Sequence, residues 1–525
     1  MRRNAIGLLV SAMLFALYCT LPFIGMVSMG KLTITFVFYF IICIVGAIVA
    51  YKICNYILPK IHCEKIEVCI YTKWTERRFF LVCWSVLLVG LIPAYLAFFP
   101  GIFGYDAPNQ LQQIMGEVPY SSHHPYFHTV ILGAFLKFGK RVAGTYNVGV
   151  ALFCITQGIV ISGSLAYSFL VMKRLRTPFP VLIMSLVWCV WNPVMQVLTF
   201  NTTKDILFGA FFLHFVLNCY YWLASHEKKT KQELVKLIVS GVLMCLLRNQ
   251  GIYIIIVLLL ISLAVNWKDK RFLASLCSIV VISQLFFTIT NNVFYVEKGD
   301  AREMLSVPMQ QMALVCKLYS EGQPVNLTQE EFDKFTLVVN EEHLKDFSLL
   351  ISDPIKSHFN TYIVKDDLAG YLSMYISVGI RNLGYYMTAF RGLILSYWDM
   401  TVNQFRGLAY ENTFPEISQR WGISQKSILL GYKEYLIDYI SNQMEKKLPF
   451  ISWLLQPGLC IWIMSALIGL TIAKKDKAVF LAVLTGLLFL GTLLLGPIAL
   501  LRYIYPLMLL TPWLLALLCN KINSL

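Results

Sequence analysis

Two long, mostly apolar runs, residues 178–200 and 479–501, constrain this chain more than any other feature of its sequence. Neither run contains a charged residue, and each exceeds the roughly 20 residues that a helix needs to cross the hydrocarbon core of a bilayer. A backbone in lipid must satisfy its own hydrogen bonds, so such runs form helices. The whole chain is 58% hydrophobic and only 14% charged, against about 25% charged in soluble domains, which predicts an all-α membrane protein.

About twelve such spans are predicted along the chain, which is the count expected from hydropathy. Their predicted positions are 5–29, 32–58, 79–99, 144–172, 178–199, 206–224, 233–247, 251–267, 272–294, 452–473, 478–498 and 503–520. This divides the chain into two additional N-terminal spans (1–58), a transmembrane module (79–294), a hydrophilic region (295–451) and the C-terminal spans (452–525). The hydrophilic region is expected to be mostly helical, with amphipathic helices at 372–380 and 387–398 lying on the membrane surface.

The net charge of +15 is unevenly distributed, and its pattern predicts orientation rather than nucleic-acid binding. Residues 295–450 hold 19 of the 29 acidic residues, whereas Lys and Arg are concentrated in alternate short loops. One set of loops carries 21 basic residues and the opposite short connections carry four. By the positive-inside rule the basic set and both termini are cytoplasmic, and segments 100–143 and 295–451 are external. A multi-pass protein of the plasma (inner) membrane is therefore expected.

Ionisable residues gather where predicted spans reach the external side. Asp106, Lys204, Asp205, Arg248 and Arg502 all have this position, whereas the centres of the spans contain essentially no Asp, Glu, Lys or Arg. Ion-coupled transporters usually need ionisable groups inside the membrane, so this distribution disfavours transport. It favours one site assembled at one membrane face.

Asp106 has two compatible interpretations. It precedes Ala107-Pro108 and a helix-like run, which is typical of a helix N-cap. It is also placed to act as a general base that removes a proton from an attacking hydroxyl. Glu117, further along the same segment, is interpreted as a solvated turn residue.

Three histidines follow in the same segment, at positions 123, 124 and 128. His124 and His128 are four residues apart and would share a face on a helix. With Asp106 they could bind a divalent metal, but this spacing alone is weak, and zinc-type cysteine spacing is absent. A hydrogen bond from His124 to the loop or to a sugar hydroxyl is preferred, and no cofactor is predicted.

The remaining polar candidates each have a structural alternative. Lys204 and Asp205 could form a local ion pair or a helix cap with Thr202 or Thr203. Arg248 and Arg502 could reach lipid headgroups, or one of them could grip a phosphate with two parallel hydrogen bonds. Gln310 and Gln311, polar in an apolar setting, could satisfy one another or a substrate. The predicted substrate-binding residues are Tyr105, Gln110, His123, His124, His128, Lys204, Asp205, Arg248, Gln310, Gln311, Arg502 and Tyr503.

Several short motifs resemble the GT-C superfamily of membrane glycosyltransferases, in particular a bacterial branch of multi-spanning proteins. They are FFPGIFGYDAPNQ, HHPYFHT, NTTKDILFG, LLRNQGIY, SVPMQQMA and GPIALLRYIYP. The resemblance implies an external loop with a catalytic acid, here Asp106, followed by two helices along the membrane at 108–115 and 125–138. Many GT-C members have two neighbouring acids in this loop, whereas GYDAPN has one, so Asp205 could supply a second carboxylate.

The resemblance implies transfer of a sugar from a polyprenyl-phosphate donor to an acceptor hydroxyl of a glycan, lipid or protein, in assembly of a cell-envelope polysaccharide. Asp106 would deprotonate the acceptor, and Arg248 or Arg502 would stabilise the departing lipid phosphate. Tyr105, Gln110 and the histidines would position sugar and acceptor, with inversion at the anomeric carbon. Alternatives are a polymerase or ligase of lipid-linked glycans, a lipid or solute transporter, and a non-catalytic scaffold.

Overall fold

The computed structural model describes residues 73–225, 229–397, 407–441, 456 and 458–523, together with a few isolated positions between 41 and 49. Within these residues the secondary structure is helical, with only isolated β-bridges between extended segments. This confirms the prediction of an all-α protein. The predicted spans 5–29 and 32–58 lie almost entirely outside the described residues.

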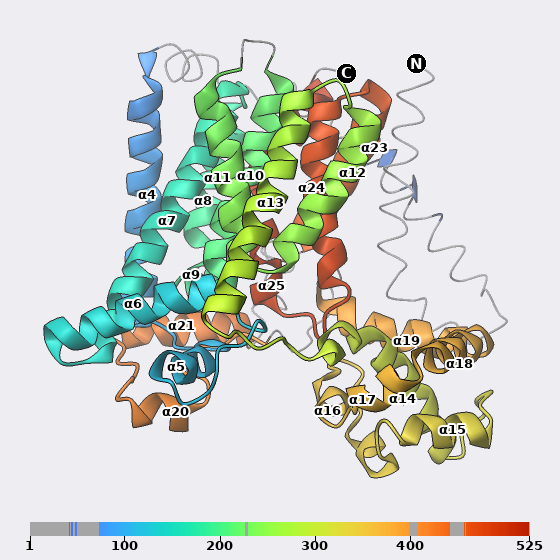
Figure 1. The fold of residues 1–525 in the computed structure, drawn as a ribbon. Helices are drawn as coiled ribbons and strands as arrows, with labels where there is room; N and C mark the ends of the chain where they lie inside the picture. The colour runs from blue at the N-terminus through green and yellow to red at the C-terminus, as the bar shows by residue number, and fades with distance from the viewer. Residues whose placement is uncertain are drawn as a thin grey trace.

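A bundle of apolar helices forms the largest part of the structure (Figure 1). Its helices are α4 (Glu76–Ala97), α7 (Tyr146–Arg174), α8 (Phe179–Trp191), α9 (Pro193–Thr199), α10 (Lys204–Ala224), α11 (Lys231–Leu247), α12 (Gln250–Val265), α13 (Lys270–Val293), α23 (Gly458–Lys474), α24 (Lys477–Leu493) and α25 (Leu501–Asn523). Five of the described helices, namely α4, α7, α10, α13 and α25, are long and apolar enough to cross a membrane, or six spans if α8 and α9 count as one. Helices α12, α23 and α24 are apolar but shorter.

The predicted span 178–199 is not one straight helix. Helices α8 and α9 meet at an angle of 55°. Pro193 has no N–H to continue the first helix, and the Asn192 side chain starts the second by accepting a hydrogen bond from Met195 N at 3.1 Å. The single span was predicted from hydropathy, which does not detect a break between two apolar helices.

The basic loops predicted from the charge pattern gather at one end of the bundle. Arg174, at the end of α7, pairs with Glu76 at the start of α4 (2.8 Å), and Lys229 pairs with Asp269 (2.9 Å). At the far end of α25, Asn520 donates a hydrogen bond to the carbonyl of Leu175. The two long polar segments lie at the opposite end of the bundle (Figure 1).

The first polar segment forms two helices, α5 (Ala107–Met115) and α6 (Tyr126–Ala143), at this opposite end (Figure 1). Their positions agree with the helices expected at 108–115 and 125–138. Helix α6 is held against α7 by a very close backbone approach at Gly139 and Gly149. A Cβ on Gly149 would lie 2.5 Å from the carbonyl oxygen of Phe135.

The described residues of the region 295–451 pack in two different places. Residues 301–394 are called the helical subdomain below. Its side chains between positions 305 and 386 form a second hydrophobic core, whereas Val307, Leu393 and Ile394 pack into the core of the bundle. The later residues 407–441 instead pack on the bundle core. The subdomain comprises η3 (Ala301–Met304), α14 (Ser306–Ser320), α15 (Gln329–Thr336), η4 (Glu341–Asp346), α16 (Asp353–Ser357), α17 (Thr361–Asp366), α18 (Leu368–Arg381) and α19 (Leu383–Ile394); η5 (Leu395–Tyr397), α20 (Pro415–Arg420) and α21 (Leu430–Ser441) follow.

The close approach of α6 to α7 gives a direct test of this packing. We expect Gly149→Ala to destabilise the protein by about 1–3 kcal/mol, because the added methyl group would overlap the α6 backbone. Gly491→Ala, on α24, is the matched control, since nothing lies within 4 Å of a Cβ there. Thermal unfolding of both variants in detergent provides the measurement, and equal midpoints for the two would contradict the packing described.

Candidate active site

Four elements bring charged side chains together at the end of the bundle that carries α5 and α6. Asp106 lies at the start of α5, Lys204 and Asp205 at the start of α10, Arg248 at the end of α11 and Arg502 at the start of α25. The nearest ion pairs join Lys204 Nζ to Asp106 Oδ2 at 3.0 Å and Arg248 Nη1 to Asp205 Oδ1 at 2.8 Å. The structure thus brings together all five ionisable residues predicted to share a site.

Asp106 and Lys204 are brought together because the extended segment before Asp106 pairs with the extended segment before Lys204. The Ile102 N–H donates to the Phe200 carbonyl at 2.8 Å, and the Thr202 N–H donates to the Ile102 carbonyl at 3.0 Å. This short parallel contact aligns the entrances to α5 and α10. The local ion pair considered between Lys204 and Asp205 does not form; each pairs with a residue far away in the chain.

Arg502 connects the two ion pairs. Its Nη1 lies 3.5 Å from Asp106 Oδ2 and 3.8 Å from Asp205 Oδ2, and it donates a longer hydrogen bond, 3.4 Å, to Thr203 Oγ1. The guanidinium carbon lies 4.1 Å from the ring centroid of Tyr105 and 4.7 Å from that of Tyr503. Two aromatic rings therefore hold the arginine plane in place.

The cluster contains three cations and two carboxylates, an excess of one positive charge, and its side chains are largely buried from solvent. The Asp205 side chain is 0% exposed, and those of Arg248 and Arg502 are each 8% exposed. Helices α10, α12 and α25 all begin here, and helix N-termini add positive potential. The Nε of Arg502 and the Nδ1 of His124 have no hydrogen-bond partner among the described residues. This arrangement is suited to binding an anion.

Asp106 is kept ionised by its neighbours. Burial alone raises the pKa of its carboxyl, but the Lys204 ammonium and the Arg502 guanidinium outweigh burial and hold the pKa well below its usual range. Asp106 occupies the N-cap position of α5 with proline in the first turn, as predicted, yet its side chain makes no capping hydrogen bond. The carboxylate is instead directed to the cations of the cluster.

Tyr105 has a backbone conformation that few residues adopt. Its φ of 56° lies in the left-handed region, which costs of order 1 kcal/mol for a residue with a side chain. Its hydroxyl donates to the Gly407 carbonyl and accepts from the Ala409 N–H, both at 2.7 Å. Asn412 adds a third contact by accepting from the Phe103 N–H at 2.9 Å. This support could not be predicted from the sequence, because nothing in residues 407–412 indicates a contact with Phe103 and Tyr105, about 300 positions earlier.

The histidines do not form the metal set considered with Asp106. His124 precedes α6, so it does not share a helix face with His128. His128 is buried, and its Nδ1 lies 3.0 Å from Gln110 Nε2. Burial lowers the pKa of His124 to about 3 and that of His128 to about 4, so both rings are neutral at pH 7. His123 contributes its backbone carbonyl, 3.4 Å from Lys204 Nζ.

Three predicted substrate-binding glutamines have structural partners instead. Gln110 is buried between α5 and α6, where it donates to Thr129 Oγ1 at 2.8 Å. Gln310 and Gln311 belong to the helical subdomain and donate to the carbonyls of Ser348 and Tyr386, respectively. These two glutamines neither satisfy one another nor reach the charged cluster. Their amides hold neighbouring segments of a packed core together through hydrogen bonds. The presence of a polar residue in an apolar stretch does not by itself distinguish this role from substrate binding.

Fold and site together define a helical membrane protein with a buried, net positive ionic cluster at one end of its bundle. The model of a family of unknown function, DUF6020, matches residues 116–523, and the chain belongs to this family. The matched range includes Lys204, Asp205, Arg248 and Arg502, whereas Asp106 lies just before it. Comparison with curated proteins and with solved structures found no match.

The buried pair between Asp205 and Arg248 should be essential for folding. Asp205→Asn leaves Arg248 without its carboxylate, and we expect a loss of about 3–5 kcal/mol of stability. The control is Glu117→Gln, which breaks the exposed pair with Arg420 and should cost less than about 1 kcal/mol. Thermal unfolding in detergent compares the two, and a similar small shift for both would show that the cluster is not a folding constraint.

The neutral histidines predict how stability depends on pH. Between about pH 6.5 and pH 4, His124 and His128 bind protons in the unfolded chain but remain neutral in the native protein. The free energy of unfolding therefore falls as the pH falls. Each histidine contributes up to about 1.4 kcal/mol per pH unit in this window. His128→Gln should make the dependence of the unfolding midpoint on pH shallower, because it removes one of these two buried rings. An unchanged slope in His128→Gln would rule out this origin.

Proposed function

We propose that this protein is a GT-C-type membrane glycosyltransferase that moves a sugar from a polyprenyl-phosphate donor to an acceptor hydroxyl. The observation that carries the proposal is the net positive, nearly dry cluster beside a carboxylate at the end of a membrane bundle. A phosphate leaving group needs cations, an acceptor hydroxyl needs a base, and a lipid donor needs a site at the membrane boundary. This one cluster offers all three.

Arg502 is the better candidate for the donor phosphate. Arg248 lies at hydrogen-bonding distance from Asp205 and contacts the rings of Phe208 and Phe489, so it is already committed to the bundle. Arg502 lies farther from its carboxylates, at 3.5 and 3.8 Å, and its Nε, like Nη1 of Arg248, has no hydrogen-bond partner among the described residues. Together with Lys204 it can offer two positive groups to one phosphate, and the flanking Tyr105 and Tyr503 rings keep its plane oriented.

Asp106 is proposed as the base, and the donor itself would activate it. While Lys204 and Arg502 face Asp106, its pKa is low and it is a weak base. A bound phosphate would compete for both cations and relieve their effect on the carboxylate. Asp106 would then accept the proton of the acceptor hydroxyl as that oxygen attacks the anomeric carbon. The bond from this carbon to the phosphate oxygen breaks on the opposite side, giving inversion and free polyprenyl phosphate.

We further propose the finer topology expected from the sequence: about twelve spans, both termini cytoplasmic and the cluster external, in a plasma membrane. Its support is the separation of the two ends, with Arg174, Lys229 and their partners at one end and the cluster at the other. A polysaccharide, lipid or protein acceptor would then approach from the external side, past α5 and the loop that carries His123 and His124.

Replacement of Asp106 by Asn tests the assignment of the base. Sugar transfer from polyprenyl-phosphate-linked hexoses should fall about 10²–10⁴-fold, the usual contribution of general base catalysis. Binding of polyprenyl phosphate alone should persist, because the cluster then has a larger excess of positive charge. Glu117→Gln, an acid of the same segment paired with Arg420, is the matched control and should retain activity. Full activity of Asp106→Asn with a transferred sugar would end the assignment.

A further inference from the structure

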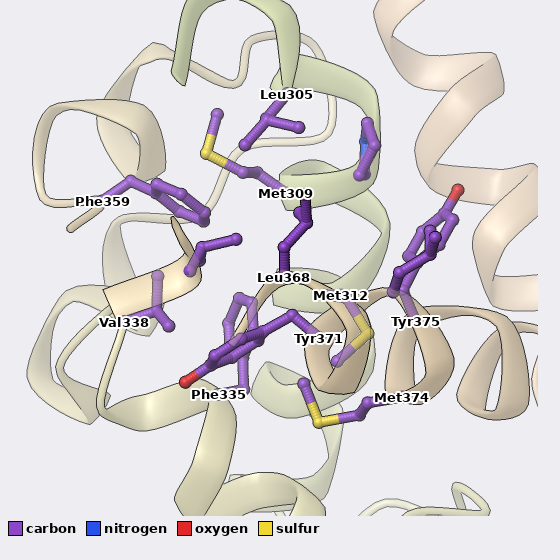
Figure 2. Close-up of a pocket in the computed structure, with 13 residues that line it drawn as sticks. Leu305, Met309, Met312, Phe335, Val338, Phe359, Leu368, Tyr371, Met374 and Tyr375 are labelled. Atoms are coloured by element: carbon purple, nitrogen blue, oxygen red, sulfur yellow. The ribbon is translucent and has the colours of Figure 1, made fainter. Parts of the chain in front are cut away.

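The helical subdomain contains a partly open apolar cavity of about 150 Å³ (Figure 2). Three methionines, Met309, Met312 and Met374, contribute to its wall. The two tyrosines of the wall direct their hydroxyls elsewhere: Tyr371 donates to the Lys334 carbonyl at 3.0 Å and Tyr375 to Gln311 Oε1 at 2.6 Å. Water needs two or more polar partners to occupy a cavity, and this wall does not supply them.

The cavity lies directly behind an exposed apolar stripe on α18. The stripe consists of side chains spaced four residues apart, each between 51% and 72% exposed, namely Leu368, Leu372, Ile376 and Ile380. Leu368 and Leu372 also line the cavity. The same two side chains therefore belong to the cavity wall and to the outer surface.

The subdomain is attached at the end of the bundle. The Ser352 N–H donates to the Pro497 carbonyl at 2.9 Å, and Ile351 forms an isolated antiparallel β-bridge with Ile498. Pro497 and Ile498 lie between α24 and α25, at the level where apolar helices end. Helices α18 and α19 extend sideways from this point (Figure 1). An exposed apolar stripe at this level is typical of a helix lying in the membrane interface.

We propose that α18 rests on the bilayer and that the acyl tail of a bilayer phospholipid enters the cavity between Leu368 and Leu372. An acyl tail needs no polar partner, and the wall of the cavity is apolar. Acyl tails are also the hydrocarbon present at a bilayer surface. Methionine side chains adapt to chains of irregular shape. The tail would fix the subdomain to the membrane, independently of any chemistry at the charged cluster.

Photolabelling of the full-length protein tests this proposal. The protein is placed in phosphatidylcholine vesicles that contain a phosphatidylcholine with a diazirine at the end of one acyl chain. After irradiation, mass spectrometry should find adducts on Met309, Met312 or Met374. Exposed Val89 and Ile92 of α4 report labelling by ordinary surrounding lipid. Adducts on α4 without any in the cavity would overturn the proposal, as would cavity adducts formed only with a diazirine-bearing isoprenoid phosphate.

Two variants separate entry into the cavity from a general effect on folding. Leu372→Glu should reduce cavity adducts about tenfold or more, because a carboxylate at the opening opposes passage of a hydrocarbon. Leu337→Glu replaces another exposed leucine of the subdomain, outside the stripe, and should leave the adducts unchanged. Met312→Phe fills the cavity without adding charge and should also reduce the adducts on Met309 and Met374. Undiminished adducts in both Leu372→Glu and Met312→Phe would refute the acyl-tail site.

Discussion

The arrangement of this protein depends on one buried ionic cluster, in which Asp205 and Asp106 are shared among Lys204, Arg248 and Arg502. Taking charges out of water is costly, and attraction offsets the cost only when every partner is in place. The partners come from the starts of α5, α10 and α25 and the end of α11. Each helix therefore has to dock at the correct depth for the others to be compensated, so the same contacts specify the fold and create the site.

The excess of positive charge in this cluster distinguishes it from a purely structural ion-pair network. A neutral set would gain nothing from an additional anion, whereas three cations facing two carboxylates leave one charge to be balanced. Arg502 lies farther from its carboxylates, at 3.5 and 3.8 Å, than Arg248 lies from Asp205, at 2.8 Å. It also donates to Thr203 and Tyr503, and its Nε has no hydrogen-bond partner among the described residues. Its plane is nevertheless held between Tyr105 and Tyr503. Residues that are oriented but incompletely paired are suited to receive a ligand.

The helical subdomain contacts the bundle at a connection that lies only a few residues before Arg502 in the sequence. The contacts of Ser352 with Pro497 and of Ile351 with Ile498 lie on the connection that leads directly into Leu501 and Arg502. A subdomain seated on the membrane would therefore set the position of the connection from which Arg502 projects.

Hydropathy and charge along the chain were sufficient to predict a helical membrane protein, the opposite ends of its bundle, and the gathering of Asp106, Lys204, Asp205, Arg248 and Arg502. These features are local or follow from the thickness of a bilayer, which fixes where a span must end. The helices expected at 108–115 and 125–138 came from the family resemblance. Tertiary structure alone decided which charges pair, that Gln110, Gln310 and Gln311 are hydrogen-bonded in packed cores, and that residues 407–412 support Tyr105. Such contacts join positions tens to hundreds of residues apart, and no periodic or compositional signal records the geometry that closes them.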